Sequence, residues 1–208
     1  MKLYYRPGAC SLASHIVLAW LGLPYETEVA NTRDPEFTKI NYLGTVPVLF
    51  TPDMGALYQS SAILRYLARL PEGLHLGPGN DPVLKAQCDY WLSFFNADVF
   101  RAFAPFFNPE KYTTDTRPEA KKAIKDAVPL QVAPLFSRMD NHLASRDYYL
   151  EDDMGIVDAC AFVYCYWATK VLANGLADYP NVARHYATML ENPQVKEVIA
   201  LEGLTITA

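Results

Sequence analysis

A single cysteine at the start of a predicted helix is the first candidate for chemistry in this 208-residue sequence. Cys10 follows a Pro-Gly turn, and Leu12 and Ile16 recur behind it at helical spacing. A helix N-terminus carries free backbone N–H groups and about half a positive charge, which stabilise a thiolate and can lower the pKa of a cysteine. Cys10 is therefore either a reactive thiol, assisted by the neighbouring hydroxyl of Ser11, or a small helix-start residue with an inert sulfur.

Two further stretches could hold a peptide-like ligand. In "LGTVPVLF", Pro47 belongs at the start or edge of a strand, because it cannot donate a hydrogen bond to a sheet. A cis Val46–Pro47 bond would turn the backbone of Val46 outward, where it could pair with a peptide, whereas an ordinary trans proline would merely begin the strand. In "YQSSAILRYLA", Gln59, Ser60 and the next free N–H groups offer a carboxylate site, although Ser60 or Ser61 can instead cap the helix.

The elements that must position these residues fall into two regions. Strand patterns at 2–5, 24–31, 46–51 and 56–59, with helices after residues 10 and 60, predict the order β-α-β, a short loop over 31–41, then β-β-α. The Pro- and Gly-rich stretch 70–82 is the predicted linker. Beyond it only helices are expected, beginning near residues 82, 118, 155, 180 and 193, with Pro129 and Pro134 kinking or dividing the second. The fold class is thus α/β plus all-α, with domains at 1–76 and 83–208.

Composition excludes several classes of protein. The net charge of -5 argues against a general affinity for nucleic acid. The most apolar stretch contains Asp158 and is shorter than a membrane span, and the first residues lack the apolar run of a signal peptide. The four cysteines have no framework spacing, so reduced thiols in a cytoplasmic protein are expected. No metal site is predicted, because the four histidines lack ligand spacing with the cysteines or with each other.

The order of these motifs resembles the cytosolic glutathione S-transferases, most closely the bacterial beta class. The similarity covers "MKLYYRPGACSLASHI", "VPVL" and "QSSAILRYLA" in the first region, and "YWLSFFNADV", "FAPFF", "VDACAF" and "LEGL" in the second. The resemblance implies a thioredoxin-like N-terminal domain that binds glutathione and a helical domain that supplies the pocket for an electrophile. It also implies a homodimer, with glutathione as co-substrate and no permanently bound cofactor.

The resemblance also implies roles for individual residues. Cys10, assisted by Ser11, would contact the glutathione sulfur and could form a mixed disulfide with it. Val46 would pair with the glutathione backbone, Pro47 would fix the turn, and Gln59 and Ser60 would hold the γ-glutamyl group. The full predicted glutathione site is Tyr5, Ala9, Cys10, Val46, Pro47, Gln59, Ser60 and Arg101, and the predicted electrophile pocket is Phe103, Phe106 and Trp167.

The sequence departs from the class at several of these places. Phe100 and Arg101 stand where the class has histidine and lysine, and Phe100 cannot exchange a proton. Leu43 replaces a lysine, and Gly155 replaces the Ser or Thr of a helix capping box, whose Asp158 is therefore expected to start the helix and not to act in catalysis.

The predicted function is conjugation of glutathione to small apolar electrophiles, a detoxification-type transfer of alkyl or aryl groups. The alternatives are a glutathione-dependent thiol-disulfide reductase that uses Cys10, a glutathione-binding protein with little turnover, and a helical interaction module.

Overall fold

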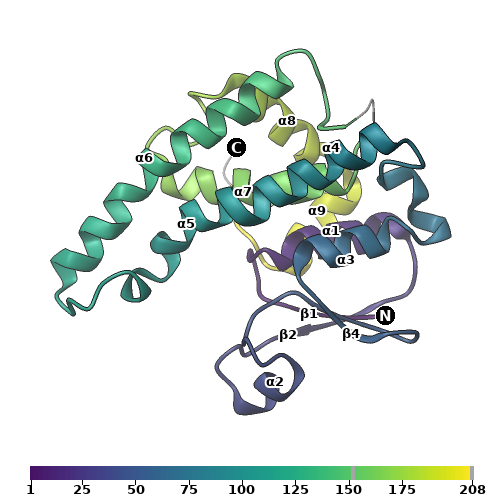
Figure 1. The fold of residues 1–208 in the computed structure, drawn as a ribbon, viewed down its shortest axis with the longest axis horizontal. Helices are drawn as coiled ribbons and strands as arrows, with labels where there is room; N and C mark the ends of the chain where they lie inside the picture. Colours follow the sequence, from purple (N-terminus) through teal and green to yellow (C-terminus); the bar gives the residue numbers. More distant parts are fainter. Residues whose placement is uncertain (151–152, 207–208) are drawn as a thin grey trace.

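Residues 2–58 supply a four-stranded sheet in the computed structural model, which describes residues 1–150 and 153–206 (Figure 1). The strands are β1 (Lys2–Tyr5), β2 (Glu26–Val29), β3 (Val48–Thr51) and β4 (Gly55–Tyr58), in the spatial order β2-β1-β3-β4. β1 and β2 are parallel, which requires a crossover, and α1 (Ser11–Leu21) provides it. β3 is antiparallel to β1 and to β4. The predicted order of the strands, with one helix between the first two and one after the last, is confirmed.

Helices cover both faces of this sheet (Figure 1). α1 and α3 (Ser60–Leu67) lie on the face toward the rest of the molecule, and α2 (Pro35–Ile40) lies on the other, where Phe37 packs with Tyr4. The loop predicted over 31–41 was wrong, because α2 forms there. Asp34 caps this helix by accepting a hydrogen bond from the backbone N–H of Glu36. The predicted cap of α3 was also wrong, because Gln59 occupies the N-cap position.

The described residues after β4 and α3 form helices and connecting turns. They are η1 (Pro71–Leu76), α4 (Pro82–Ser93), the π-helical turn η2 (Phe94–Val99), α5 (Phe100–Phe107), η3 (Pro109–Lys111), α6 (Pro118–Leu143), α7 (Ile156–Val171), α8 (Pro180–Glu191) and α9 (Pro193–Leu201). α6 is one helix that includes Pro129 and Pro134, so these prolines do not divide it as one form of the prediction had it. The buried side chains of α6 follow helical spacing: Val128, Val132, Phe136 and Met139. The free energy gained by burying them exceeds the cost of the two backbone hydrogen bonds that the prolines cannot make.

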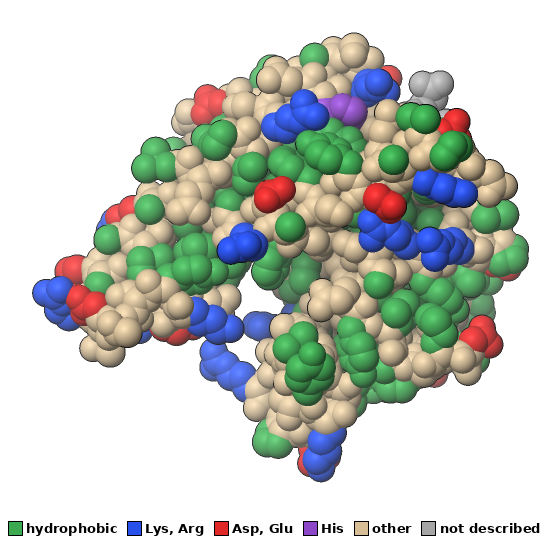
Figure 2. Space-filling model, viewed as in Figure 1, with side chains coloured by type: hydrophobic (Ala, Val, Ile, Leu, Met, Phe, Trp, Pro, Cys, Tyr) green, Lys and Arg blue, Asp and Glu red, His purple; other side chains and the backbone are tan. Residues whose placement is uncertain are grey.

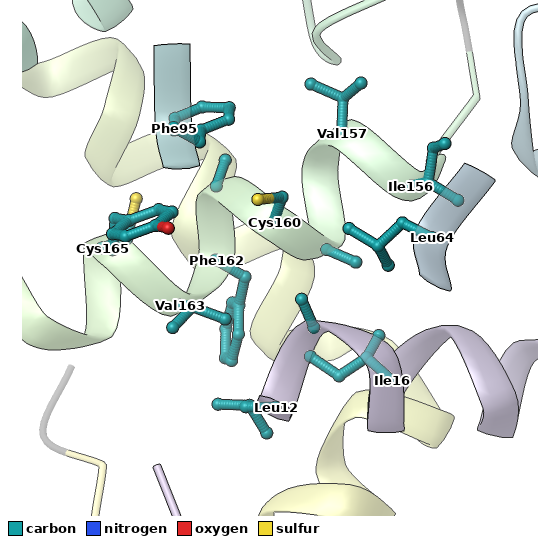
Figure 3. Packing of buried hydrophobic residues seen from close by; sticks show 14 of the residues in the cluster. Leu12, Ile16, Leu64, Phe95, Ile156, Val157, Cys160, Phe162, Val163 and Cys165 are labelled. Atoms are coloured by element: carbon teal, nitrogen blue, oxygen red, sulfur yellow. The ribbon is translucent and has the colours of Figure 1, made fainter. Parts of the chain in front are cut away.

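One continuous core joins the two regions. α7 runs through its centre, and Figure 3 shows Ile156 and Val163 of α7 near Leu64 of α3 and the α1 residues Leu12 and Ile16. Such burial of several aliphatic side chains stabilises the contact by about 1.5–3 kcal/mol for each side chain. The sheet region and the helices are therefore packed against each other through apolar side chains. No helix within the described ranges is both long enough and apolar enough to cross a bilayer.

Candidate functional site

The loop between β1 and α1 brings Cys10 against the segment before β3. Cys10 is the N-cap of α1, and its Sγ donates a hydrogen bond to the carbonyl of Val46 at 3.1 Å. The Val46–Pro47 peptide bond is cis. Two motifs that lie 36 residues apart in the sequence therefore meet at one point.

The thiol of Cys10 is protonated at neutral pH. Burial raises its pKa to about 11, and the backbone N–H groups of Cys10 and Ser11 oppose this effect only in part. The helix N-terminus therefore acts in the predicted direction but is outweighed by desolvation. Ser11 is fully buried, and its hydroxyl accepts from the backbone N–H of Arg6 at 3.2 Å and donates to the Arg6 carbonyl at 3.3 Å. The hydroxyl of Ser11 therefore serves to close the loop. This leaves the thiol of Cys10 as the side chain that can donate a hydrogen bond to a ligand.

Gly8, in the same loop, is held by two side chains from the helical region. The carboxylate of Glu202 accepts a hydrogen bond from the Gly8 N–H at 2.8 Å, and the indole of Trp167 donates one to the Gly8 carbonyl at 2.7 Å. Glu202 is buried and its other oxygen lies 2.8 Å from Nδ1 of His15. Gly8 has a φ of 66°, and a Cβ atom there would lie 2.9 Å from the ring of Tyr166, so both the turn and the close approach require glycine.

The sequence analysis gave no role to Glu202 or His15. An acidic residue in the otherwise apolar "LEGL" was the one signal, because a buried carboxylate requires a partner. Tyr5, predicted to bind glutathione, is buried with its ring centroid 5.3 Å from that of His15, and burial raises the pKa of its hydroxyl. Ala9 is half-buried in the loop.

The start of α3 provides the second part of the candidate site. Gln59 has a φ of 72° and a ψ of 122°, a conformation that costs a non-glycine residue about 1–3 kcal/mol and that clusters at functional sites. Its side chain makes no capping hydrogen bond, and the first turn of α3 begins with Ser60, which is buried. The backbone N–H groups of this turn can therefore donate hydrogen bonds to an anionic group, as predicted from the sequence.

The aromatic residues predicted to bind an electrophile divide between core and surface. Phe103 is fully buried and contacts Phe136 and Trp167, so it belongs to the core of the helical region, contrary to the prediction. Phe106 is half-buried, with the ammonium of Lys125 5.4 Å from its ring centroid. Trp167 is 5% exposed.

Two other aromatic side chains are accessible next to Trp167. Phe100 and Phe107 are 38% and 46% exposed, and their ring centroids lie 6.1 Å and 4.8 Å from that of Trp167. Figure 2 shows a hollow between the arm formed by α5 and α6 and the N-terminal region, with Lys and Arg side chains at its rim. Arg101 is exposed and pairs with none of the described carboxylates.

Two cavities lie elsewhere and contain none of the residues predicted to bind glutathione. One of about 480 Å³ lies beside α3 and α4, lined in part by Arg65, Arg69 and Lys85, and one of about 440 Å³ lies beside α7 and α8. Within the part of the chain that the structure describes, no three His, Cys, Asp or Glu side chains are grouped so that they could hold a metal ion.

Asp158 organises the start of α7, as predicted. Its buried carboxylate accepts from the backbone N–H of Gly155 at 2.9 Å and of Tyr149 at 3.1 Å, and lies 2.8 Å from Nε2 of His185. The glycine at position 155 also has a structural reason, because a Cβ atom there would lie 2.6 Å from the carbonyl oxygen of Leu76.

Comparison with known proteins finds family matches in both the sheet region and the helical region. Residues 8–70 match the family described as "Glutathione S-transferase, N-terminal domain", and residues 94–193 match "Glutathione S-transferase, C-terminal domain". The chain is 34% identical over 207 residues to the glutathione S-transferase GST-4.5 of Xanthomonas campestris pv. campestris, covering 98% of this chain and 100% of that protein.

Two solved structures extend this similarity to the fold. A sphingomonad glutathione S-transferase complexed with glutathione superposes with a TM-score of 0.85 at 28% identity, over 99% of this chain and 100% of the other. The bacterial beta class glutathione S-transferase of Sphingomonas chungbukensis gives a TM-score of 0.85 at 27% identity, over the same shares of the two chains. The architecture is that of a thioredoxin-like domain followed by a helical domain.

Proposed function

The chain belongs to the glutathione S-transferase family, and we propose that it conjugates glutathione to small apolar electrophiles at the site beside Cys10. The observation that carries the proposal is the 3.1 Å contact between the Cys10 thiol and the Val46 carbonyl. It joins the two segments that would bind the cysteinyl part of glutathione, one through its sulfur and one through its backbone.

Glutathione would lie along the N-terminal domain from Cys10 to the start of α3. The backbone of Val46, next to the cis Pro47, would pair with the peptide, and the first turn of α3 with Gln59 and Ser60 would take the γ-glutamyl carboxylate. The sphingomonad relative is described in complex with glutathione, which supports the same ligand here.

Cys10 would act as a hydrogen-bond donor to the glutathione sulfur. Its raised pKa keeps the proton on its own sulfur, and that S–H can turn from the Val46 carbonyl to a glutathione thiolate. The thiol proton of glutathione passes to solvent, and the thiolate then attacks the electrophilic carbon. A C–S bond forms while the leaving group departs with its bonding electrons. In an addition, the π electrons of the activated double bond move instead to its electron-withdrawing group, and the anion that results takes a proton from solvent. A hydrogen-bond donor beside the glutathione sulfur stabilises the negative charge of the thiolate and therefore lowers the pKa of the bound glutathione thiol.

The electrophile would enter the hollow beside the aromatic side chains of α5 and α7. Phe100, Phe106 and Phe107 give it accessible aromatic surface, and Trp167 supports the wall from behind. Arg101 would supply positive charge near the site. Flat, apolar electrophiles suit such a surface.

The same geometry makes a thiol-disulfide reductase the weaker alternative. Reduction of a mixed disulfide requires the thiolate of Cys10 as nucleophile, and a pKa of about 11 leaves about one thiol in ten thousand ionised at pH 7. A glutathione-binding protein with little turnover is the second candidate, favoured by Phe100, which cannot accept the thiol proton.

Retention on immobilised glutathione, followed by conjugation of chlorodinitrobenzene, tests the proposal. We expect the parent protein to bind and to conjugate, and to reduce hydroxyethyl disulfide only slowly. Cys10→Ala should lose that slow reduction, whereas its conjugation should fall only in part. Cys88→Ala is the matched control, because Cys88 is a buried thiol that lies outside the site. A folded parent that is not retained would refute glutathione binding, and retention without conjugation would favour the binding protein.

We also propose that the chain functions as a cytoplasmic homodimer. Val83 and Tyr90 on α4 are 63% and 45% exposed, which supports an apolar contact with a second copy. The four cysteines are free thiols, which supports a reducing compartment. Light scattering at several protein concentrations would measure the mass, and a monomer of 23.4 kDa throughout would contradict the dimer.

A further inference from the structure

Asn96 connects the helical domain to the start of α3 through its side chain. It is half-buried in the π-helical turn η2, and its Nδ2 donates hydrogen bonds to Oγ of Ser61 at 2.8 Å and to the carbonyl of Leu92 at 2.7 Å. The same nitrogen lies 3.8 Å from Sγ of Cys160 in the core. A π-helical turn inside a helix is rare and often marks a functional position. This turn therefore places an amide at the boundary between the two domains.

Both hydrogens of this amide are used, and that fixes its orientation. An asparagine NH₂ group has two donor hydrogens in one plane, so two oxygen acceptors at 2.8 Å or less define where the plane lies. The hydrogen bond to Leu92 fixes the amide relative to α4 and η2. The hydrogen bond to Ser61 then fixes the start of α3 relative to the amide.

Ser61 lies inside the turn where the γ-glutamyl carboxylate is proposed to bind. It follows Ser60, and both come directly after Gln59 with its φ of 72°. The first backbone bond of α3 runs from the N–H of Ile63 to the carbonyl of Gln59, so the donors of Ser60 and Ser61 precede the internal helical ladder. The hydrogen bond from Asn96 to Ser61 therefore restrains the turn that is proposed to bind the anion.

A second side-chain contact joins α3 to α4, but it restrains the first turn of α3 less. Nε of Arg65 lies 2.7 Å from the carboxylate of Asp89, but the Asp89 side chain is 63% exposed. Exposed ion pairs contribute little because water screens them. The half-buried amide of Asn96 is the stronger constraint, and its partner Ser61 is nearer to Gln59 along the chain than Arg65 is.

We infer that Asn96 is a positioning residue for glutathione, which holds the N-terminal turn of α3 in the conformation that binds the γ-glutamyl carboxylate. The inference rests on the proposed function. It assigns to the helical domain a part in binding the co-substrate, through one side chain that does not touch the ligand.

Asn96→Ala tests this inference through a change in glutathione affinity alone. We expect the Kd and KM for glutathione to rise about three- to tenfold, the range for one lost hydrogen bond, while kcat and the KM for the electrophile stay unchanged. Cysteinylglycine, which lacks the γ-glutamyl residue, provides the second arm. Its Kd should be equal for parent and variant, because the part of the site that Asn96 supports is then empty.

Variants of Ser61 separate a specific contact from a general loss of structure. Ser61→Ala should reproduce the loss, Ser61→Thr should restore the parent value because it keeps the hydroxyl, and the double variant with Asn96→Ala should be no worse than either single one. Asn174→Ala is the matched control, since Asn174 is an exposed amide that bonds only to Asp178 among the described residues, and it should leave the Kd unchanged.

The outcomes distinguish this inference from the proposed function. A parent that binds glutathione, with an Asn96→Ala variant that binds it equally well, overturns the inference and leaves the function standing. An equal loss for glutathione and cysteinylglycine also overturns it. A parent that binds no glutathione overturns both. If Asn96→Ala does not fold, the comparison of Ser61→Ala with Ser61→Thr decides, and equal affinities there would overturn the inference.

Discussion

Replacing Gly155 with serine should destabilise the protein, although serine is a good residue at a helix N-cap. Gly155 is the N-cap of α7, where serine would gain a few tenths of a kcal/mol over glycine. The new Cβ atom would lie 2.6 Å from the carbonyl oxygen of Leu76, however, and that oxygen belongs to the backbone of η1. Overpacking of this kind costs about 1–3 kcal/mol, so the clash outweighs the cap.

A net loss of about 2 kcal/mol should lower the Tm by about 4–8 °C for a chain of this size. Urea unfolding followed by circular dichroism would measure the same change as a lower midpoint at constant slope. Gly155→Ala carries the same Cβ without the hydroxyl, so it should be less stable than Gly155→Ser by the value of the cap. The expected order of stability is glycine, serine, alanine. A serine variant at least as stable as the parent would refute the reasoning, because the contact with Leu76 would then relax without cost.

Three further predictions concern Cys10, the aromatic residue Phe100 of α5, and Glu202. Alkylation of Cys10 by iodoacetamide should rise about tenfold per pH unit until about pH 11, because burial keeps the thiol protonated; peptide mass spectrometry measures it, and a plateau below about pH 9 would contradict the raised pKa. Phe100→His should increase conjugation if a missing proton acceptor limits the rate, and an unchanged kcat would dismiss that limitation. Glu202→Ala should cost about 3 kcal/mol, because it leaves the Gly8 N–H and His15 without their acceptor; amide exchange at Gly8 should accelerate, and an unchanged rate would show that Trp167 alone holds the loop.

Local sequence signals were sufficient for the order of the strands and for the place of Cys10 at the start of α1. Alternating strand residues and the Pro-Gly turn before Cys10 act within a few residues, and the structure follows both of them. A division of α6 at its prolines does not occur, because the packing of Val128 and Phe136 is a tertiary effect that helix propensity does not contain.

The details of the candidate site depend on contacts that no local pattern encodes. Residue type cannot tell an aromatic wall from an aromatic core, so Phe103 was placed in a pocket although it is fully buried. The pKa of Cys10 depends on how much protein surrounds the sulfur, and the helix N-terminus gave only the opposing effect. The residues alone left the cis bond at Pro47 as one of two alternatives, since trans is the commoner form for an isolated X–Pro pair.

The two hydrogen bonds on Gly8 have a consequence for how the protein is made. Their donor and acceptor side chains lie 159 and 194 positions further along the chain, so synthesis must pass Trp167 and Glu202 before these two bonds can form. The sheet domain is synthesised before the helical one and can begin to fold first. Its thiol-bearing turn nevertheless remains incomplete until α9 docks, so a turn that is translated early is completed late.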